Sequence, residues 1–208
     1  MQPAHLLDLA PTLEENTVKH LVYYLQGTAS YTFTYSLDNM SNEPFTTFSD
    51  ADHSRCKDNG CLTVGYITKL GTGAISWSSK LQGIVTLSST KAEYSATIEA
   101  GKEICWMINL LSELGFKSDK SSSLHIDNQL TIQVTKNPEY HGHMKQLDLK
   151  FFWLYDNIEQ RKISPEFMQI EQMPADILTK ALPKVKIELF SKMIGISKAE
   201  TTQHEQSN

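Results

Sequence analysis

The spacing of apolar residues changes from strand-like to helical near residue 90, and this change most constrains the fold of the chain. Three consecutive runs rich in β-branched and aromatic residues predict strands: 45–51 (FTTFSDA), 61–70 (CLTVGYITKL) and 73–79 (GAISWSS). The last two meet at the tripeptide GTG, which favours a hairpin. From Thr90 to Leu114, apolar residues recur at helical spacing instead. The sequence therefore predicts an antiparallel group of strands followed by a long helix.

The second half of the chain alternates between helical and strand-like segments. Short strands are expected at 122–127 (SSLHID) and 163–172 (ISPEFMQIEQ). Helices are expected at 129–136, 144–162 and, broken by Pro183, 174–195. A strand that returns to the sheet after a helix requires a crossover, which makes the sheet mixed. We therefore expect an α/β fold in which a five-stranded mixed sheet is flanked by helices.

Further segments lie outside this pattern. Residues 13–25 (LEENTVKHLVYYL) predict an amphipathic helix that ends at Gly27, and residues 30–37 (SYTFTYSL) predict a strand. The polar tail, 197–208, is expected to be disordered.

The composition limits which classes of function are compatible with the chain. The formal net charge is -5 and the pI about 5.8, which argues against binding nucleic acid through many lysine and arginine contacts to phosphate. A metal-dependent nuclease stays compatible, because bound cations neutralise carboxylates. The sequence has no apolar run long enough to span a bilayer, no signal-peptide pattern and no cysteines at metal-binding spacing. We expect an intracellular protein without a membrane partner, a disulfide framework or a structural zinc site.

Acidic residues stand at the ends of several predicted elements. They are Asp50 at the end of the first strand, Glu93 in the first turn of the long helix, Asp127 at the end of the strand LHID, and Asp176 in the first turn of the last helical region. Because elements of one sheet end near one another, these carboxylates can converge at one edge. Converging carboxylates repel one another unless cations join them, and Mg²⁺ prefers oxygen ligands. The pattern is therefore compatible with a metal site.

Each acidic residue also has an ordinary structural explanation. In the tetrapeptide TKAE, Thr90 can cap the helix while Glu93 bonds back to it, as in a capping box. A cap does not require Glu93 to lie on the apolar stripe of the helix, where Ala96 also lies. Asp50 and Asp127 can belong to turns where strands end, and Asp176 can interact with the helix dipole. On the residues alone, both interpretations remain open.

Several motifs, taken in order, resemble a known family. FSDADHS, GAISWSSKLQGIVTLSSTKAEYSATIEAGKEICWM, HIDNQ and MPADILTKALP are similar to the ribonuclease H domain of copia-type retrotransposon Pol polyproteins. The resemblance covers residues 46–196. Residues 1–45 resemble the end of the reverse transcriptase and its connection in the same polyproteins, and residues 197–208 form the tail. The chain thus resembles a C-terminal fragment of such a polyprotein.

The resemblance implies a ribonuclease H-like fold and cleavage of the RNA strand of RNA–DNA hybrids during reverse transcription. The acidic motif of the family corresponds to Asp50, Glu93, Asp127 and Asp176. These would be catalytic residues and ligands of two Mg²⁺ ions, for which Mn²⁺ can substitute. The implied partners are the hybrid and the upstream reverse transcriptase domain of the same polyprotein. The implied location is the cytoplasm, including retrotransposon particles.

The family pattern also places three residues on the substrate side. Ser89 and Thr90, before Glu93, and Gln129, after Asp127, would face the minor groove of the hybrid. Hydroxyl and amide groups suit contacts to 2′-OH groups and base edges there. For Ser89 and Thr90, helix capping alone is an equally open explanation.

The chain departs from the family pattern away from the carboxylates. His53 stands where Trp is usual, Lys91 where Glu is frequent, and Gln146 where His is common. The stretch ISPEFMQIEQM, before Asp176, lacks the mobile His of many cellular relatives. The chain also lacks the basic insertion with which those relatives hold the hybrid, so we expect weak binding.

Two other functions remain open on the sequence. An integrase or transposase core shares the fold and would combine Asp50 and Asp127 with Glu159 or Glu166. That assignment leaves the placement of the other two acidic residues unexplained. A decayed or domesticated copy would be a non-catalytic module that only packs against a reverse transcriptase, but intact carboxylates argue against decay.

Overall fold

The structure is a computed structural model that describes residues 15–36, 43–52, 62–82, 89–136 and 148–199. The chain forms two units. Residues Phe33–Ile196 make up the larger one, and the residues up to Thr32 together with those from Ser197 make up the smaller one. The domain boundaries expected after residues 45 and 196 remain predictions.

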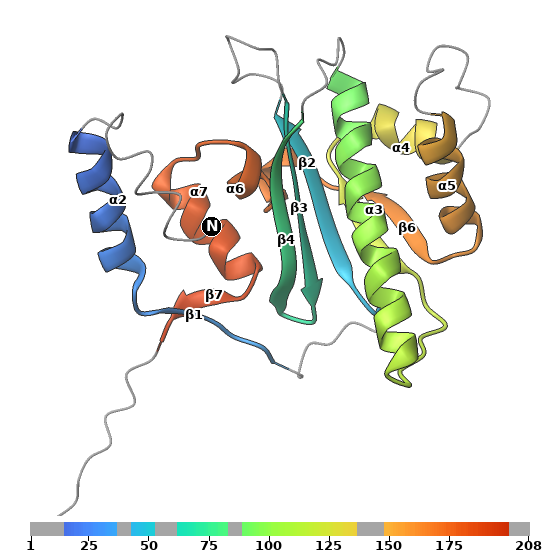
Figure 1. Ribbon diagram of the computed structural model, residues 1–208, viewed down its shortest axis with the longest axis horizontal. Coiled ribbons are helices and arrows are strands. Elements are labelled where there is room, and N and C mark those ends of the chain that lie inside the picture. Colours follow the sequence, from blue (N-terminus) through green and yellow to red (C-terminus); the bar gives the residue numbers. More distant parts are fainter. Residues whose placement is uncertain (1–14, 37–42, 53–61, 83–88, 137–147, 200–208) are drawn as a thin grey trace, which may run out of the picture. The chain divides into compact units, whose positions relative to one another are not determined.

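A five-stranded mixed sheet forms the centre of the larger unit (Figure 1). The sheet order is β4-β3-β2-β5-β6, with the bounds β2 (Thr46–Asp52), β3 (Leu62–Leu70), β4 (Gly73–Gln82), β5 (Ser122–Ile126) and β6 (Ile163–Phe167). β2, β3 and β4 are antiparallel neighbours, whereas β5 pairs in parallel with β2, and β6 with β5. The predicted α/β fold with a five-stranded mixed sheet is confirmed.

Helices cover both faces of this sheet. α3 (Ser89–Glu113), α4 (Gln129–Lys136) and α5 (Asp148–Glu159) pack against one apolar core that includes side chains of β5 and β6. The short helix α6 (Asp176–Thr179) contacts β2 and β3. Side chains alternate along β2, so Ala51 faces α3 while Phe48 packs on the α6 side of the sheet.

The helical spacing of apolar residues in α3 corresponds to a buried stripe. Ala96, Ala100, Ile104 and Met107 along this helix are all buried. The helix ends shortly before Gly115, which adopts a φ of 89° that suits glycine at a helix end. The long helix predicted from periodicity is therefore present, and its apolar stripe faces the core.

The smaller unit holds the amphipathic helix and most of a two-stranded sheet. α2 covers Glu15–Thr28, and β1 (Tyr31–Phe33) pairs with β7 (Ile196–Lys198). Two expectations are wrong here. α2 continues through Gly27, because one glycine near a helix end costs only about 1 kcal/mol. Residues 197 and 198 lie in β7 rather than in a disordered tail, because β1 supplies a pairing partner.

The last part of the larger unit is more irregular than expected. β6 stops at Phe167, and Ile170–Gln172 form a 3-10 turn, so the strand expected at 163–172 is shorter. α7 (Lys184–Met193) begins directly after Pro183. The expected start of α5 at residue 144 lies outside the described residues. In the part of the chain that the structure describes, no helix is both long and apolar enough to cross a membrane.

Candidate metal centre

Asp50 and Asp127 lie side by side at the carboxyl ends of neighbouring strands. β2 and β5 pair in parallel with Ser49 opposite Ile126, so the next residue on each chain segment is one of the two aspartates. Asp50 remains within β2 and is buried, whereas Asp127 directly follows β5 and is partly exposed. The parallel pairing therefore brings these two carboxylates to the same edge of the sheet.

Helix α3 supplies Glu93, because small side chains let its first turns approach the sheet. Ala92 and Ala96 pack against Ala51 of β2 and against apolar residues of β3. Glu93 is buried, and its carboxylate accepts a hydrogen bond from the backbone of Ala51. The Glu93 side chain is thus directed toward the end of β2.

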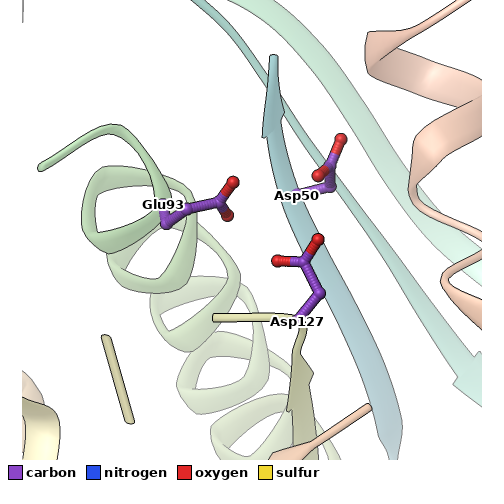
Figure 2. A group of neighbouring side chains, drawn as sticks. All are labelled: Asp50, Glu93 and Asp127. Carbon is purple, nitrogen blue, oxygen red and sulfur yellow. The ribbon is translucent and has the colours of Figure 1, made fainter. Parts of the chain in front are cut away.

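Asp50, Glu93 and Asp127 form one carboxylate group (Figure 2). One oxygen of each residue lies within 4.8 Å of the others, and the three side chains point toward one another from β2, α3 and the end of β5. Oε2 of Glu93 is buried and has no hydrogen-bond partner among the described residues. A buried oxygen of this kind is costly unless a proton or a cation satisfies it.

Burial and mutual repulsion raise the pKa values within the carboxylate group. Burial, followed by the charges of Asp127 and Asp50, raises the pKa of Glu93 from 4.5 to about 9. Burial, followed by the charge of Asp50, raises the pKa of Asp127 from 3.8 to about 6. Negative charge is therefore unfavourable at this edge of the sheet unless a cation compensates it.

The carboxylate group fits a hard divalent cation. All three side chains offer oxygen ligands, which Mg²⁺ and Mn²⁺ prefer. Oε2 of Glu93 offers an atom that has no other partner in the described structure. Three of the four predicted acidic residues therefore meet at a place where a cation would relieve an electrostatic cost.

Asp176, the fourth predicted residue, reaches the site through a lysine. Lys180 Nζ lies 2.9 Å from Oδ1 of Asp50 and 2.8 Å from Oδ1 of Asp176. The hydroxyl of Thr179 donates a second hydrogen bond to Asp50, at Oδ2. Asp176 is therefore a neighbour of Asp50, but within the described residues it does not belong to the carboxylate group.

The ion pairs change the pKa values of Lys180 and Asp176. Partial burial acts to lower the pKa of Lys180, but hydrogen bonds and charges from Asp176 and Asp50 outweigh it and raise the pKa overall. Burial raises the pKa of Asp176, opposed by the hydrogen bond from Lys180. Lys180 therefore stays positively charged next to the carboxylate group.

The residues predicted on the substrate side are only partly described. Ser89 and Thr90 are the first two residues of α3, and their side chains lie outside the described residues. Gln129 is the exposed first residue of α4, two positions after Asp127. The contact of all three with a substrate remains a prediction. The departures at positions 53 and 146 also fall outside the described residues.

Glu159 and Glu166, the candidates for an integrase-type site, do not belong to the carboxylate group. Glu159 accepts a hydrogen bond from the Tyr155 hydroxyl, and Glu166 lies beside His125. Within the described part of the chain, the carboxylates that meet are three of those implied by the ribonuclease H resemblance.

The chain has a ribonuclease H-like fold. Among solved structures, it is similar to LC11-RNase H1, isolated from compost, with a TM-score of 0.51 and 20% identity. That match covers 67% of this chain and 94% of the other. The ribonuclease H-like fold implied by the motifs is thereby confirmed. No protein-family model matches the sequence.

The sequence relatives are polyproteins of plant transposons. The chain is 34% identical over 180 residues to the retrovirus-related Pol polyprotein from transposon TNT 1-94 of Nicotiana tabacum, and 32% identical over 183 residues to that from transposon RE2 of Arabidopsis thaliana. These matches cover 86% and 88% of this chain but only 13% and 12% of the relatives. By sequence, the chain is therefore related to a segment of copia-type retrotransposon Pol polyproteins, with the fold of a ribonuclease H domain.

Thr179 and Lys180 belong to the surroundings of the site but are absent from the sequence-based prediction. One signal was present, since Lys180 follows Asp176 by four residues in a helical segment, a spacing that brings two side chains together. The contact of both residues with Asp50, about 130 positions upstream, depends on how α6 packs on β2 and has no local signal.

Proposed function

We propose that this chain is a metal-dependent endonuclease that cleaves the RNA strand of RNA–DNA hybrids during retrotransposon reverse transcription. The observation that carries this proposal is the meeting of Asp50, Glu93 and Asp127 within 4.8 Å. The ribonuclease H fold and the relation to transposon Pol polyproteins support the same function.

The proposed cofactors are two Mg²⁺ ions, for which Mn²⁺ can substitute. Asp50 is the carboxylate common to the group with Glu93 and Asp127 and to the neighbouring pair with Asp176. We therefore assign one ion to the group and the other to Asp50 and Asp176. When bound, such ions stabilise the attacking and leaving oxygens of an in-line phosphoryl displacement.

The chain itself contributes rigid placement of the ligands. Asp50 is held within β2 and accepts the hydrogen bond from Thr179, while Glu93 is held by the packing of α3 on the sheet. Ligands fixed by packed secondary structure need little reorganisation during the reaction. The partly exposed position of Asp127 leaves one side of the group accessible to a substrate phosphate.

We assign substrate contacts to the residues at the starts of α3 and α4. Ser89, Thr90 and Gln129 supply hydroxyl and amide groups that can bond 2′-OH groups in the minor groove of a hybrid. The net charge of -5 provides little general attraction to phosphate. An upstream reverse transcriptase that holds the same duplex would supply the missing affinity.

A cleavage assay with a panel of end-labelled substrates tests this function. With Mg²⁺ or Mn²⁺, the RNA strand of a hybrid should be cut, while single-stranded RNA and duplex DNA should survive; excess chelator should abolish cleavage. Nicking or strand transfer on duplex DNA would support the integrase-type alternative. Hybrid binding without any cleavage at saturating metal would support a non-catalytic module.

A further inference from the structure

Lys180 occupies the position between two buried carboxylates. Its ammonium nitrogen lies 2.9 Å from Asp50 Oδ1 and 2.8 Å from Asp176 Oδ1. The side chains of these aspartates are only 0% and 3% exposed, whereas that of Lys180 is 25% exposed. The chain itself therefore offsets part of the negative charge of these two buried carboxylates.

The carboxylate group beside this pair is compensated differently. Glu93 and Asp127 approach Asp50 without a lysine between them, and Oε2 of Glu93 is left without a partner in the described structure. The two sides of Asp50 therefore differ. On one side, Glu93 and Asp127 approach Asp50 directly, and on the other side the ammonium of Lys180 lies between Asp50 and Asp176.

We propose that Lys180 is an internal counter-cation that competes with the second divalent ion. Its ammonium holds Asp50 and Asp176 together while no metal is bound, and it must leave before an ion binds between them. The first ion, at Asp50, Glu93 and Asp127, would share only Asp50 with the ammonium and so meets less competition. The two ions should therefore bind with unequal affinity.

The side chain of Lys180 is suited to such a displacement. Lysine carries a compact charge on a flexible four-carbon stem, so its ammonium can move to solvent without a change in the backbone. Its partial exposure supplies a short path to water. This inference rests on the proposed metal site, but not on hydrolysis of any substrate.

The test is a Mn²⁺ titration of the whole chain, followed by electron paramagnetic resonance of the free ion. The parent should bind two ions in separate steps. In Lys180→Met, the affinity for the second ion should rise by roughly tenfold or more, the size of a typical coupling between two linked binding events. The first step should change less. Lys184→Met is the matched control, because it removes an exposed lysine at the start of α7, four residues further along the chain, that pairs with Glu188. Both steps should stay as in the parent.

Thermal unfolding in chelator supplies the second readout. Lys180→Met should lower the midpoint, because Asp50 and Asp176 then repel each other, and saturating Mn²⁺ should remove most of this loss. The double variant Lys180→Met with Asp176→Asn removes the repulsion, so its midpoint in chelator should return toward that of the parent. If the single variant does not fold without metal, folding of the double variant in chelator still tests whether repulsion between Asp50 and Asp176 is the cause.

An unchanged or weaker second Mn²⁺ step in Lys180→Met would overturn the inference, since a lysine with a purely structural role cannot hinder metal binding. A double variant as unstable as the single one would overturn it too, by showing that packing rather than charge matters. Failure of the proposed function has a different signature. Normal two-step Mn²⁺ binding by a parent that cuts no hybrid would contradict the nuclease and leave the role of Lys180 intact.

Discussion

Gly65 of β3 lies against Thr179 of α6 with no room for a side chain between them. A Cβ atom at Gly65 would be 2.9 Å from Cγ2 of Thr179 and 2.9 Å from Cβ of Leu178. Gly65 is also the residue opposite Asp50 in the pairing of β2 with β3. This glycine therefore lets α6 approach close enough for Thr179 and Lys180 to reach the carboxylate of Asp50.

Replacing Gly65 should weaken both the fold and the site. We expect Gly65→Ala to lower the free energy of unfolding by roughly 1–3 kcal/mol, the usual range for an overpacked position. Cleavage of the hybrid should fall as well, because α6 is pushed away from Asp50. Urea unfolding and the cleavage rate measure these effects. Gly27→Ala in α2 is the control, since a Cβ there meets nothing within 4 Å. This substitution should raise the free energy of unfolding by about 0.5–1 kcal/mol, because alanine favours the helix. If Gly65→Ala were as stable as the parent, α6 could shift away from β3 at no cost in stability, and the close contact at Gly65 would not be required.

Local sequence patterns predict most of the helices and strands of the fold, but they predict the metal centre only in part. The positions of β2, β3 and α3 come from periodicity, and the parallel crossover to β5 then places Asp127 beside Asp50. The position of Glu93 on the apolar stripe also indicated that it faces the sheet. These inferences succeed because each uses spacing within one element or the shared end of neighbouring strands.

The rest depends on contacts between distant segments. The pairing of β1 with β7 joins residues near the two ends of the chain, and no local pattern specifies it. Asp176 lies on the other side of Lys180 from Asp50, and Lys180 can reach Asp50 because Gly65 leaves room for α6 to approach β3. The sequence predicts four converging carboxylates. In the structure, Asp50, Glu93 and Asp127 converge, and Asp176 is an ion-paired neighbour of this group.

Glu93→Gln separates a metal ligand from a helix cap. Because burial raises the pKa of Glu93 to about 9, this side chain is neutral at pH 7 without metal, and glutamine is a close substitute. Thermal stability in chelator should therefore change little, while stabilisation by Mg²⁺ should shrink and cleavage should fall by about a hundredfold or more. Glu99→Gln, at a partly exposed residue of the same helix that pairs with Lys102, should keep both properties. If Glu93→Gln were as active as the parent, Glu93 would be a helix cap rather than a metal ligand.

The stability of the metal-free protein should fall as the pH rises. Between pH 4.5 and about 9, the unfolded chain has lost a proton that the folded chain keeps on Glu93, and Asp127 acts in the same direction between 3.8 and about 6. Each such group lowers the free energy of unfolding by at most about 1.4 kcal/mol per pH unit. Midpoints measured in chelator at pH 5, 7 and 9 should decline, and Mg²⁺ should reduce the decline because it favours the ionised carboxylates. A midpoint that rises across this range would contradict the raised pKa values.

Salt should inhibit the isolated chain strongly. With a net charge of -5, the isolated chain should bind a hybrid weakly at best, so salt that competes for its contacts to phosphate removes binding it cannot spare. We expect binding and cleavage to drop steeply between about 50 and 200 mM salt. Fusion to the upstream reverse transcriptase should restore cleavage by raising the effective concentration of the hybrid. Tight binding by the chain alone that is insensitive to salt would contradict this explanation.

The central claim is that the carboxylate group holds the metal that drives RNA cleavage, and Asp127→Asn tests it most directly. Asp127 follows β5 and is partly exposed, so the substitution removes a charge with little effect on packing. The measurement is the rate of RNA-strand cleavage in a hybrid at saturating Mg²⁺, beside Asp119→Asn, a control at an exposed position between α3 and β5. We predict a rate at least about a hundredfold below the parent for Asp127→Asn and an unchanged rate for Asp119→Asn. Equal rates for Asp127→Asn and the parent would contradict a metal-dependent nuclease at this site.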